Sequence, residues 1–95
     1  MKIAVLGGGQ LARMLAEAAR PLGISVRFLD PGIDACAASV AEQIVGAFDD
    51  QKQLETLTRD ADVATYEFEN VPQASIDFLG KKLPVFPSAL ALSSA

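Results

Sequence analysis

The sequence predicts an α/β protein built on an open, parallel, doubly wound sheet of about five strands. Two observations lead to this fold class. Short apolar runs alternate with segments of helical periodicity along all 95 residues. The connections between these segments are also short, so right-handed crossovers place helices on both faces of a single sheet. A chain of this length suits one small domain, residues 1–95, with one core.

The first strand is followed by a glycine-rich turn. An apolar run over residues 3–6 precedes Gly7-Gly8-Gly9-Gln10-Leu11-Ala12, where a helical stretch begins. Glycines permit a tight turn and a close approach of ligand to backbone, while a helix start directs N–H groups and a positive dipole end at an anion. The spacing Gly7-x-Gly9-x-x-Ala12 also matches the dinucleotide fingerprint. We therefore expect a phosphate-binding turn in a Rossmann-like domain.

The helix after this turn is expected to extend to Leu22. Pro21 and Gly23 then mark its end, because proline cannot continue a helix and glycine commonly follows one. Apolar residues recur at helical spacing and predict the side that faces the sheet. These residues are Leu11, Met14, Leu15, Ala18, Ala19 and Leu22.

The middle of the chain is expected to contain two strands separated by a helical turn. Val26 and Phe28 are the inward residues of the first of these strands, which is rich in β-forming residues. Cys36 stands among alanines, a pattern typical of a buried structural thiol. The expected elements are a strand at 24–29, a turn at 30–32, one or two helical turns at 35–41 and a short strand at 43–45.

The second half of the chain repeats the alternation of helix and strand. Asp50 is a helix N-cap with Gln53 three positions later, and Leu54 and Leu57 face the core from that helix. The expected elements are this helix, a fourth strand at 62–66, a helix with Pro72 in its first turn, a fifth strand at 83–86 and a further helix within 88–95.

Composition excludes several classes of function. A net charge of −4 without a basic cluster argues against nucleic acid as a partner. The apolar runs are far shorter than the roughly 20 residues of a membrane span, so we expect a cytoplasmic protein with no membrane partner. With no histidine and a single cysteine, the chain offers no zinc site and no Ser–His pair, and no metal is expected.

Polar residues cluster after the expected fourth strand, in Thr65-Tyr66-Glu67-Phe68-Glu69-Asn70. Ligands of such sheets bind at the carboxyl ends of the strands, near the glycine turn. Glu67 should point into that crevice, and Glu69 faces the same way if the chain stays extended. Two like charges so placed call for a cationic or amino-bearing partner. The alternative is a solvated turn with Asn70 as an N-cap.

Asp30 ends the expected second strand and has two readings of equal weight. An acid at this position binds the adenosine ribose in NAD enzymes. Asp30 also precedes Pro31-Gly32, where an aspartate is a common turn former.

Together these segments resemble the N-terminal domain of N5-carboxyaminoimidazole ribonucleotide synthetase, an ATP-grasp ligase family of purine biosynthesis. The specific parts of the match are the glycine turn and the run Tyr66-Glu67-Phe68-Glu69-Asn70. The family usually has glycine where this chain has Ala12, a residue still small enough for helix–strand packing. The other matching segments, in order, are Pro21-Leu22-Gly23-Ile24, Leu29-Asp30-Pro31 and Pro84-Val85-Phe86-Pro87-Ser88.

The resemblance implies a ligase that converts 5-aminoimidazole ribonucleotide, bicarbonate and ATP to the N5-carboxy product, ADP and phosphate. In that family ATP phosphorylates bicarbonate, and the exocyclic amine of the ribonucleotide captures the carboxyl group. ATP and magnesium bind to ATP-grasp domains that are absent from this chain. We therefore expect the 95-residue portion to bind no cofactor and to be inactive alone, and the full-length enzyme to form a homodimer.

The resemblance also assigns roles to particular residues. Backbone amides of Gly8, Gly9, Gln10 and Leu11 would bind the ribonucleotide, mainly through its phosphate. Glu67 would accept hydrogen bonds from the amine and orient it for attack, which makes it the candidate catalytic residue. The candidates for supporting roles are Asp30, Glu69 and Asn70.

Two other functions stay open. A free-standing regulatory module that senses NAD is supported by the glycine spacing together with Asp30, although Glu67 and Glu69 serve no purpose beside a pyrophosphate. The chain also suits the equivalent domain of another ATP-grasp ligase, such as a glycinamide ribonucleotide transformylase or a biotin carboxylase. Gln10 and the Tyr66–Asn70 run favour the aminoimidazole enzyme.

Overall fold

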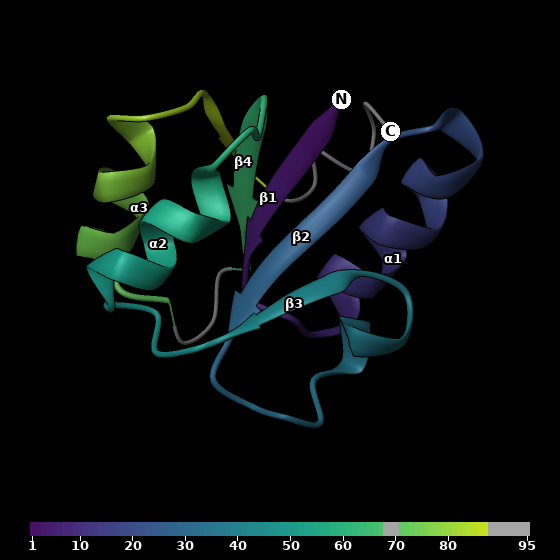
Figure 1. The fold of residues 1–95 in the computed structure, drawn as a ribbon, viewed down its shortest axis with the longest axis horizontal. Helices are drawn as coiled ribbons and strands as arrows, with labels where there is room; N and C mark the ends of the chain where they lie inside the picture. Colours follow the sequence, from purple (N-terminus) through teal and green to yellow (C-terminus); the bar gives the residue numbers. More distant parts are fainter. Residues whose placement is uncertain (68–70, 88–95) are drawn as a thin grey trace.

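The computed structural model of the chain describes residues 1–67 and 71–87 (Figure 1). Its five strands form one parallel sheet in the order β3-β2-β1-β4-β5, which confirms the doubly wound fold. The strands are β1 (Lys2–Leu6), β2 (Ser25–Asp30), β3 (Glu42–Val45), β4 (Val63–Tyr66) and β5 (Val85–Pro87). The helices are α1 (Gln10–Ala19), α2 (Gln51–Thr58) and α3 (Gln73–Gly80), with short 3-10 segments η1 (Arg20–Leu22) and η2 (Cys36–Ser39).

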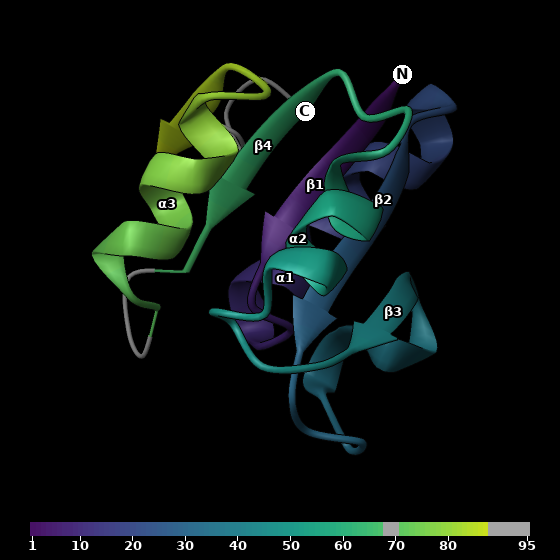
Figure 2. The same ribbon diagram turned by 60° about the vertical axis from the view of Figure 1, so that its left-hand side comes forward.

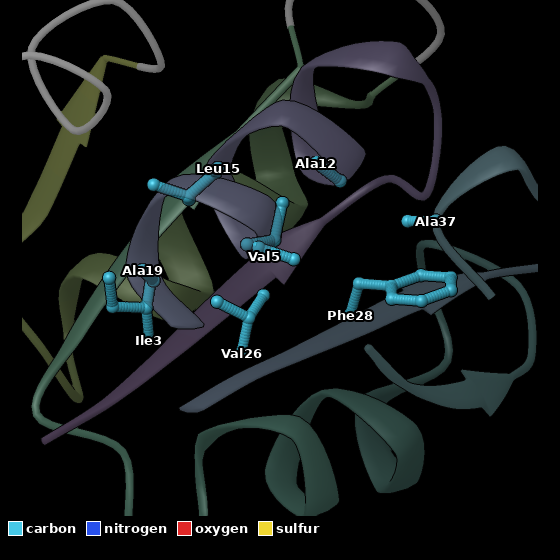
Figure 3. Packing of buried hydrophobic residues seen from close by; sticks show 9 residues of the cluster. Ile3, Val5, Ala12, Leu15, Ala19, Val26, Phe28 and Ala37 are labelled. Carbon is cyan, nitrogen blue, oxygen red and sulfur yellow. The ribbon is translucent and has the colours of Figure 1, made fainter. Parts of the chain in front are cut away.

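Helices cover both faces of the sheet. Figures 1 and 2 show α1 on one side and α2 and α3 on the other. The core therefore has two halves. Val26 and Phe28 lie in the half under α1 and η2, as expected from their alternation (Figure 3). Leu54 and Leu57 of α2 lie in the other half, also as expected.

The buried side of α1 overlaps the expected one only in part: Leu15 and Ala19 are buried as expected, whereas the other expected residues are not. Met14 and Leu22 are 46% and 57% exposed, and Ala18 is exposed as well. Small residues line most of the contact, which lets the helix backbone approach the sheet closely, and α1 ends before η1, so that Leu22 leaves the helical stripe. The buried residues are Ala12, Leu15, Ala16 and Ala19.

The prediction of a buried thiol at Cys36 is wrong. Cys36 is exposed, and its neighbour Ala37 is fully buried in the cluster that contains Phe28. The N–H of Ala37 donates to the carbonyl of Gly8 at 2.9 Å. This bond fixes η2 against the glycine turn with Ala37 inward, which leaves Cys36 on the outer side.

The remaining elements differ from the expected ones mainly at their ends. The carboxylate of Asp50 accepts from the amides of Lys52 and Gln53, which confirms the predicted N-cap. Pro72 is the N-cap of α3 rather than a residue of its first turn. None of the helices in the described ranges is long and apolar enough to cross a bilayer. The helix predicted within 88–95 lies outside the described residues.

Candidate functional site

The candidate site lies at the carboxyl edge of the three central strands. Strand β1 pairs with β2 on one side and with β4 on the other, so the segments that follow these strands meet. The N–H of Gly7 donates to the carbonyl of Leu29 at 2.8 Å, and the N–H of Glu67 donates to the carbonyl of Leu6 at 3.1 Å. The glycine turn is thereby held between Asp30 and Glu67.

The carboxylate of Glu67 binds directly to the start of α1. Oε2 accepts from the N–H of Gly9 at 3.2 Å, and Oε1 accepts from the N–H of Ala12 at 3.1 Å. A carboxylate is favoured there by the helix dipole and by the charged character of both hydrogen bonds. Because the N-cap of α1 is a glycine, Glu67 supplies the cap from 55 residues beyond Ala12. The sequence placed Glu67 at this edge, but it did not indicate that the turn itself is its partner.

Asp30 holds the glycine turn from the other side. Its Oδ2 accepts from the N–H of Gly8 at 2.9 Å, and its Oδ1 accepts from the N–H of Gly32 at 2.8 Å. The second bond is the local turn contact that the sequence indicated. The first bond ties β2 to the glycine turn and was not foreseen.

The three glycines of the turn make room for other parts of the protein. Gly7 has a φ of +115°, a conformation that favours glycine. A Cβ on Gly9 would lie 2.7 Å from Oε2 of Glu67, and a Cβ on Gly8 would lie 2.3 Å from the Phe28 ring. The buried Phe28 ring therefore requires a glycine at Gly8 independently of any ligand, and a side chain at Gly9 would make the carboxylate of Glu67 shift.

Two adjacent amides of the turn have no hydrogen-bond partner among residues 1–67 and 71–87. In the described part of the chain, no hydrogen bond engages the N–H groups of Gln10 and Leu11. These are the first two residues of α1, where N–H groups lack intrahelical partners and favour an anion. They are the donors that this site offers to a phosphate group.

Side chains of α1 and η2 form the outer margin of the site. The thiol of Cys36 lies 3.2 Å from Oε1 of Gln10, a contact that no pattern in the sequence indicated. The Nε–H of Arg13 donates to Oε1 of Glu17 at 2.8 Å, and this hydrogen bond, followed by the interaction with Cys36, raises the pKa of Arg13. Within residues 1–67 and 71–87, no three acidic, histidine or cysteine side chains are grouped to hold a metal ion.

Most of the predicted site residues thus meet at one edge of the sheet. Glu69 and Asn70 lie outside the described residues. An open hollow of about 410 Å³ lies at the opposite edge, lined in part by Lys2, Arg20 and Ile24 near the amino ends of β1 and β2. It shares no residue with the glycine turn, so it is separate from the candidate site. The residues that the structure brings together are Gly8, Gly9, Gln10, Leu11, Asp30 and Glu67.

Comparisons with known proteins agree with this architecture. Residues 1–95 match the profile of a family described as the ribonucleotide synthetase preATP-grasp domain. Over all 95 residues the chain is 50% identical to an N5-carboxyaminoimidazole ribonucleotide synthase from Pseudomonas aeruginosa, of which it covers 26%. It superposes with a TM-score of 0.85 on a crystal structure of the synthetase from Thermus thermophilus at 49% identity, covering 100% of this chain and 26% of that one.

A third relative was crystallised with ligands. The N5-carboxyaminoimidazole synthase from Aspergillus clavatus, in complex with ADP and 5-aminoimidazole ribonucleotide, matches with a TM-score of 0.75 and 33% identity. The match covers 97% of this chain and 25% of that one. The chain therefore spans about a quarter of the length of the relatives described here.

Proposed function

The chain belongs to the ribonucleotide synthetase preATP-grasp domain family, and from this premise we propose that it is the ribonucleotide-binding N-terminal domain of a carboxylating ligase. The full-length enzyme would convert 5-aminoimidazole ribonucleotide, bicarbonate and ATP to N5-carboxyaminoimidazole ribonucleotide, ADP and phosphate. The observation that carries the proposal is the pair of open amides at Gln10 and Leu11 beside the carboxylate of Glu67. The similarity to synthases over the whole chain supports it.

The phosphate of the ribonucleotide would accept hydrogen bonds from the amides of Gln10 and Leu11. The positive end of the α1 dipole favours the same anion. Gly8 and Gly9 take part in this arrangement indirectly, because their own amides are bound to Asp30 and Glu67. Their role is to shape the turn that presents the two open donors.

Glu67 would hold the amine-bearing end of the ribonucleotide. A carboxylate has about four acceptor positions, and the amides of Gly9 and Ala12 occupy two of them. The remaining lone pairs are available to the N–H groups of the exocyclic amine. Such hydrogen bonds would fix the direction of the nitrogen lone pair toward the carboxyl carbon, and orientation of this kind lowers the barrier of a bimolecular step.

In this proposal ATP does not bind at the glycine turn. Two neighbouring amides suit one phosphate group, whereas a triphosphate with magnesium requires more donors and a set of carboxylate ligands. Relatives have been crystallised with ADP and with ATP. We assign ATP and magnesium to parts of the full-length enzyme outside this chain's span. Association into homodimers and a cytoplasmic location belong to the same proposal.

An NMR titration of the 95-residue chain with 5-aminoimidazole ribonucleotide and, separately, with NAD tests the function. We expect the ribonucleotide to shift the amide signals of Gln10, Leu11 and Glu67, with a Kd in the millimolar range that corresponds to about 4 kcal/mol. NAD should leave them unchanged. Shifts at the glycine turn and Asp30 with NAD alone would replace this function with a dinucleotide sensor.

A further inference from the structure

We propose that Glu67 sets the ligand specificity of the glycine turn, so that the turn accepts one phosphate group and rejects a diphosphate. The inference deepens the proposed function and rests on it for the identity of the natural ligand. Its structural basis is a division among the amides of residues 8–12: internal carboxylates bind three of them, and two have no partner among the described residues. The start of α1 can bind an anion, and the carboxylate of Glu67 already occupies two of its amides.

The five consecutive amides of the turn divide into two groups. Asp30 takes the N–H of Gly8, and Glu67 takes those of Gly9 and Ala12. The N–H groups of the two residues between them have no partner among the described residues. Two adjacent donors can serve the oxygens of one phosphate. A second phosphate would require the donors that Glu67 already occupies.

The charge of Glu67 acts in the same direction as this shortage of donors. Dinucleotide-binding domains place a pyrophosphate at the N-terminus of the helix that follows the glycine turn. In this chain a carboxylate is bound at that helix start, so a diphosphate seated there would meet a like charge at close range. Juxtaposed like charges select strongly against the wrong partner. A single phosphate at the Gln10 and Leu11 amides keeps the favourable dipole and meets less of the repulsion.

The structure also holds the carboxylate in place. A Cβ on Gly7 would lie 3.2 Å from Oε2 of Glu67, and a Cβ on Gly9 would lie 2.7 Å from it, so the turn encloses the side chain closely. The backbone N–H of Glu67 is bound to Leu6 at the end of β1. A competing diphosphate would have to displace an anion that already has two hydrogen bonds and a fitted enclosure.

The experiment compares inorganic phosphate and inorganic pyrophosphate as probes of the 95-residue chain by amide NMR. Glu67→Gln removes the charge and keeps the size of the side chain, while Glu67→Ala serves as a second variant should the first distort the turn. Glu55→Gln is the matched control, since it changes the net charge equally at an exposed position of α2. We expect pyrophosphate to bind about tenfold or more tightly to the Glu67 variants than to the unmodified chain and to Glu55→Gln.

The unmodified chain supplies an independent readout. Phosphate should shift the Gln10 and Leu11 amides and leave those of Gly9 and Ala12 bound to Glu67. Pyrophosphate binding to the unmodified chain as tightly as phosphate, or no gain of pyrophosphate affinity in either Glu67 variant, would overturn the inference. Titration with 5-aminoimidazole ribonucleotide separates the two proposals, because the failure of that ligand to bind rejects the function and leaves the pyrophosphate comparison to be judged on its own result.

Discussion

Amides at the starts of α1 and of α2 are bound by side-chain carboxylates from different places in the sequence. Helix α2 is capped locally by Asp50, whose Oδ1 accepts from the second and third amides of the helix at 3.0 and 3.4 Å. Helix α1 has a glycine at its N-cap and takes its acceptor from Glu67, after strand β4. The local cap uses the donors that a ligand would need. At α1, Glu67 instead binds the amides of Gly9 and Ala12, which lie on either side of the two donors that a ligand could use.

This difference explains why one helix start is a candidate site and the other is not. In α1 the amides of its first two residues, Gln10 and Leu11, remain without a partner among the described residues. In α2 the second amide, that of Lys52, is already bound to its own N-cap. The glycine at the N-cap of α1 therefore differs from Asp50 in more than the loss of a side-chain acceptor. The capping role passes to Glu67, whose position leaves two adjacent donors unbound by any described residue.

The largest expected effect comes from filling the space before α1. Gly8→Ala would place a Cβ 2.3 Å from the Phe28 ring and 3.0 Å from Cβ of Ala35. Phe28 is fully buried, so the ring has no free space to move into. We expect a loss of about 3 kcal/mol in the free energy of unfolding, measured by urea denaturation with a constant m-value.

Asp49→Ala is the matched control for that substitution. Asp49 is exposed and stands at the corresponding position one residue before the N-cap of α2. Its substitution should change stability by less than about 0.5 kcal/mol. Equal effects of the two substitutions would show that the approach to α1 is no more constrained by the core than the approach to α2.

The second prediction compares the two caps themselves. Glu67→Ala removes an acceptor of two charged hydrogen bonds in a half-buried position, and we expect a loss of about 2 kcal/mol. Asp50→Ala removes an exposed local cap, and the expected loss is about 1 kcal/mol. Amide hydrogen exchange should quicken at Gly9 and Ala12 in the first variant and at Lys52 in the second. If exchange at Gly9 and Ala12 is unchanged in Glu67→Ala, the distant cap does not exist in solution.

The same contrast shows which parts of the molecule the sequence could predict. The Asp50 cap and the order of strands and helices depend on residues a few positions apart, and the structure confirms them. The contact of Glu67 with Gly9 joins residues 58 positions apart. It depends on the register in which Leu6 is opposite Tyr66, which brings the residue that follows β4 beside the turn. The sequence placed Glu67 at the correct edge, but the partner of its carboxylate follows from that register.

The sequence also could not predict which residues are buried where two packings place similar apolar side chains against the core. The apolar residues of α1 allow two overlapping stripes that share Leu15 and Ala19, and the structure buries the one that also contains Ala12 and Ala16. Likewise, a run of small residues around Cys36 does not say which of them faces Phe28. The bond from Ala37 to Gly8 decides that question, and it links two connections that lie far apart in the chain.

The smallest expected effect concerns the turns that follow the C-terminal ends of η1 and α2. Gly23 ends η1 with a φ of +73°, whereas Asp60, after α2, adopts a φ of +61° with a side chain present. Asp60→Gly should relieve this backbone cost, partly offset by the greater freedom of glycine in the unfolded chain, for a net gain of about 0.5 kcal/mol. Gly23→Asp is the reciprocal change, and a Cβ there would meet nothing within 4 Å, so its expected loss of about 1 kcal/mol reflects backbone conformation alone. Urea midpoints of the two variants measure the pair. A loss of stability in Asp60→Gly would mean that the Asp60 side chain stabilises the turn by more than its left-handed backbone costs.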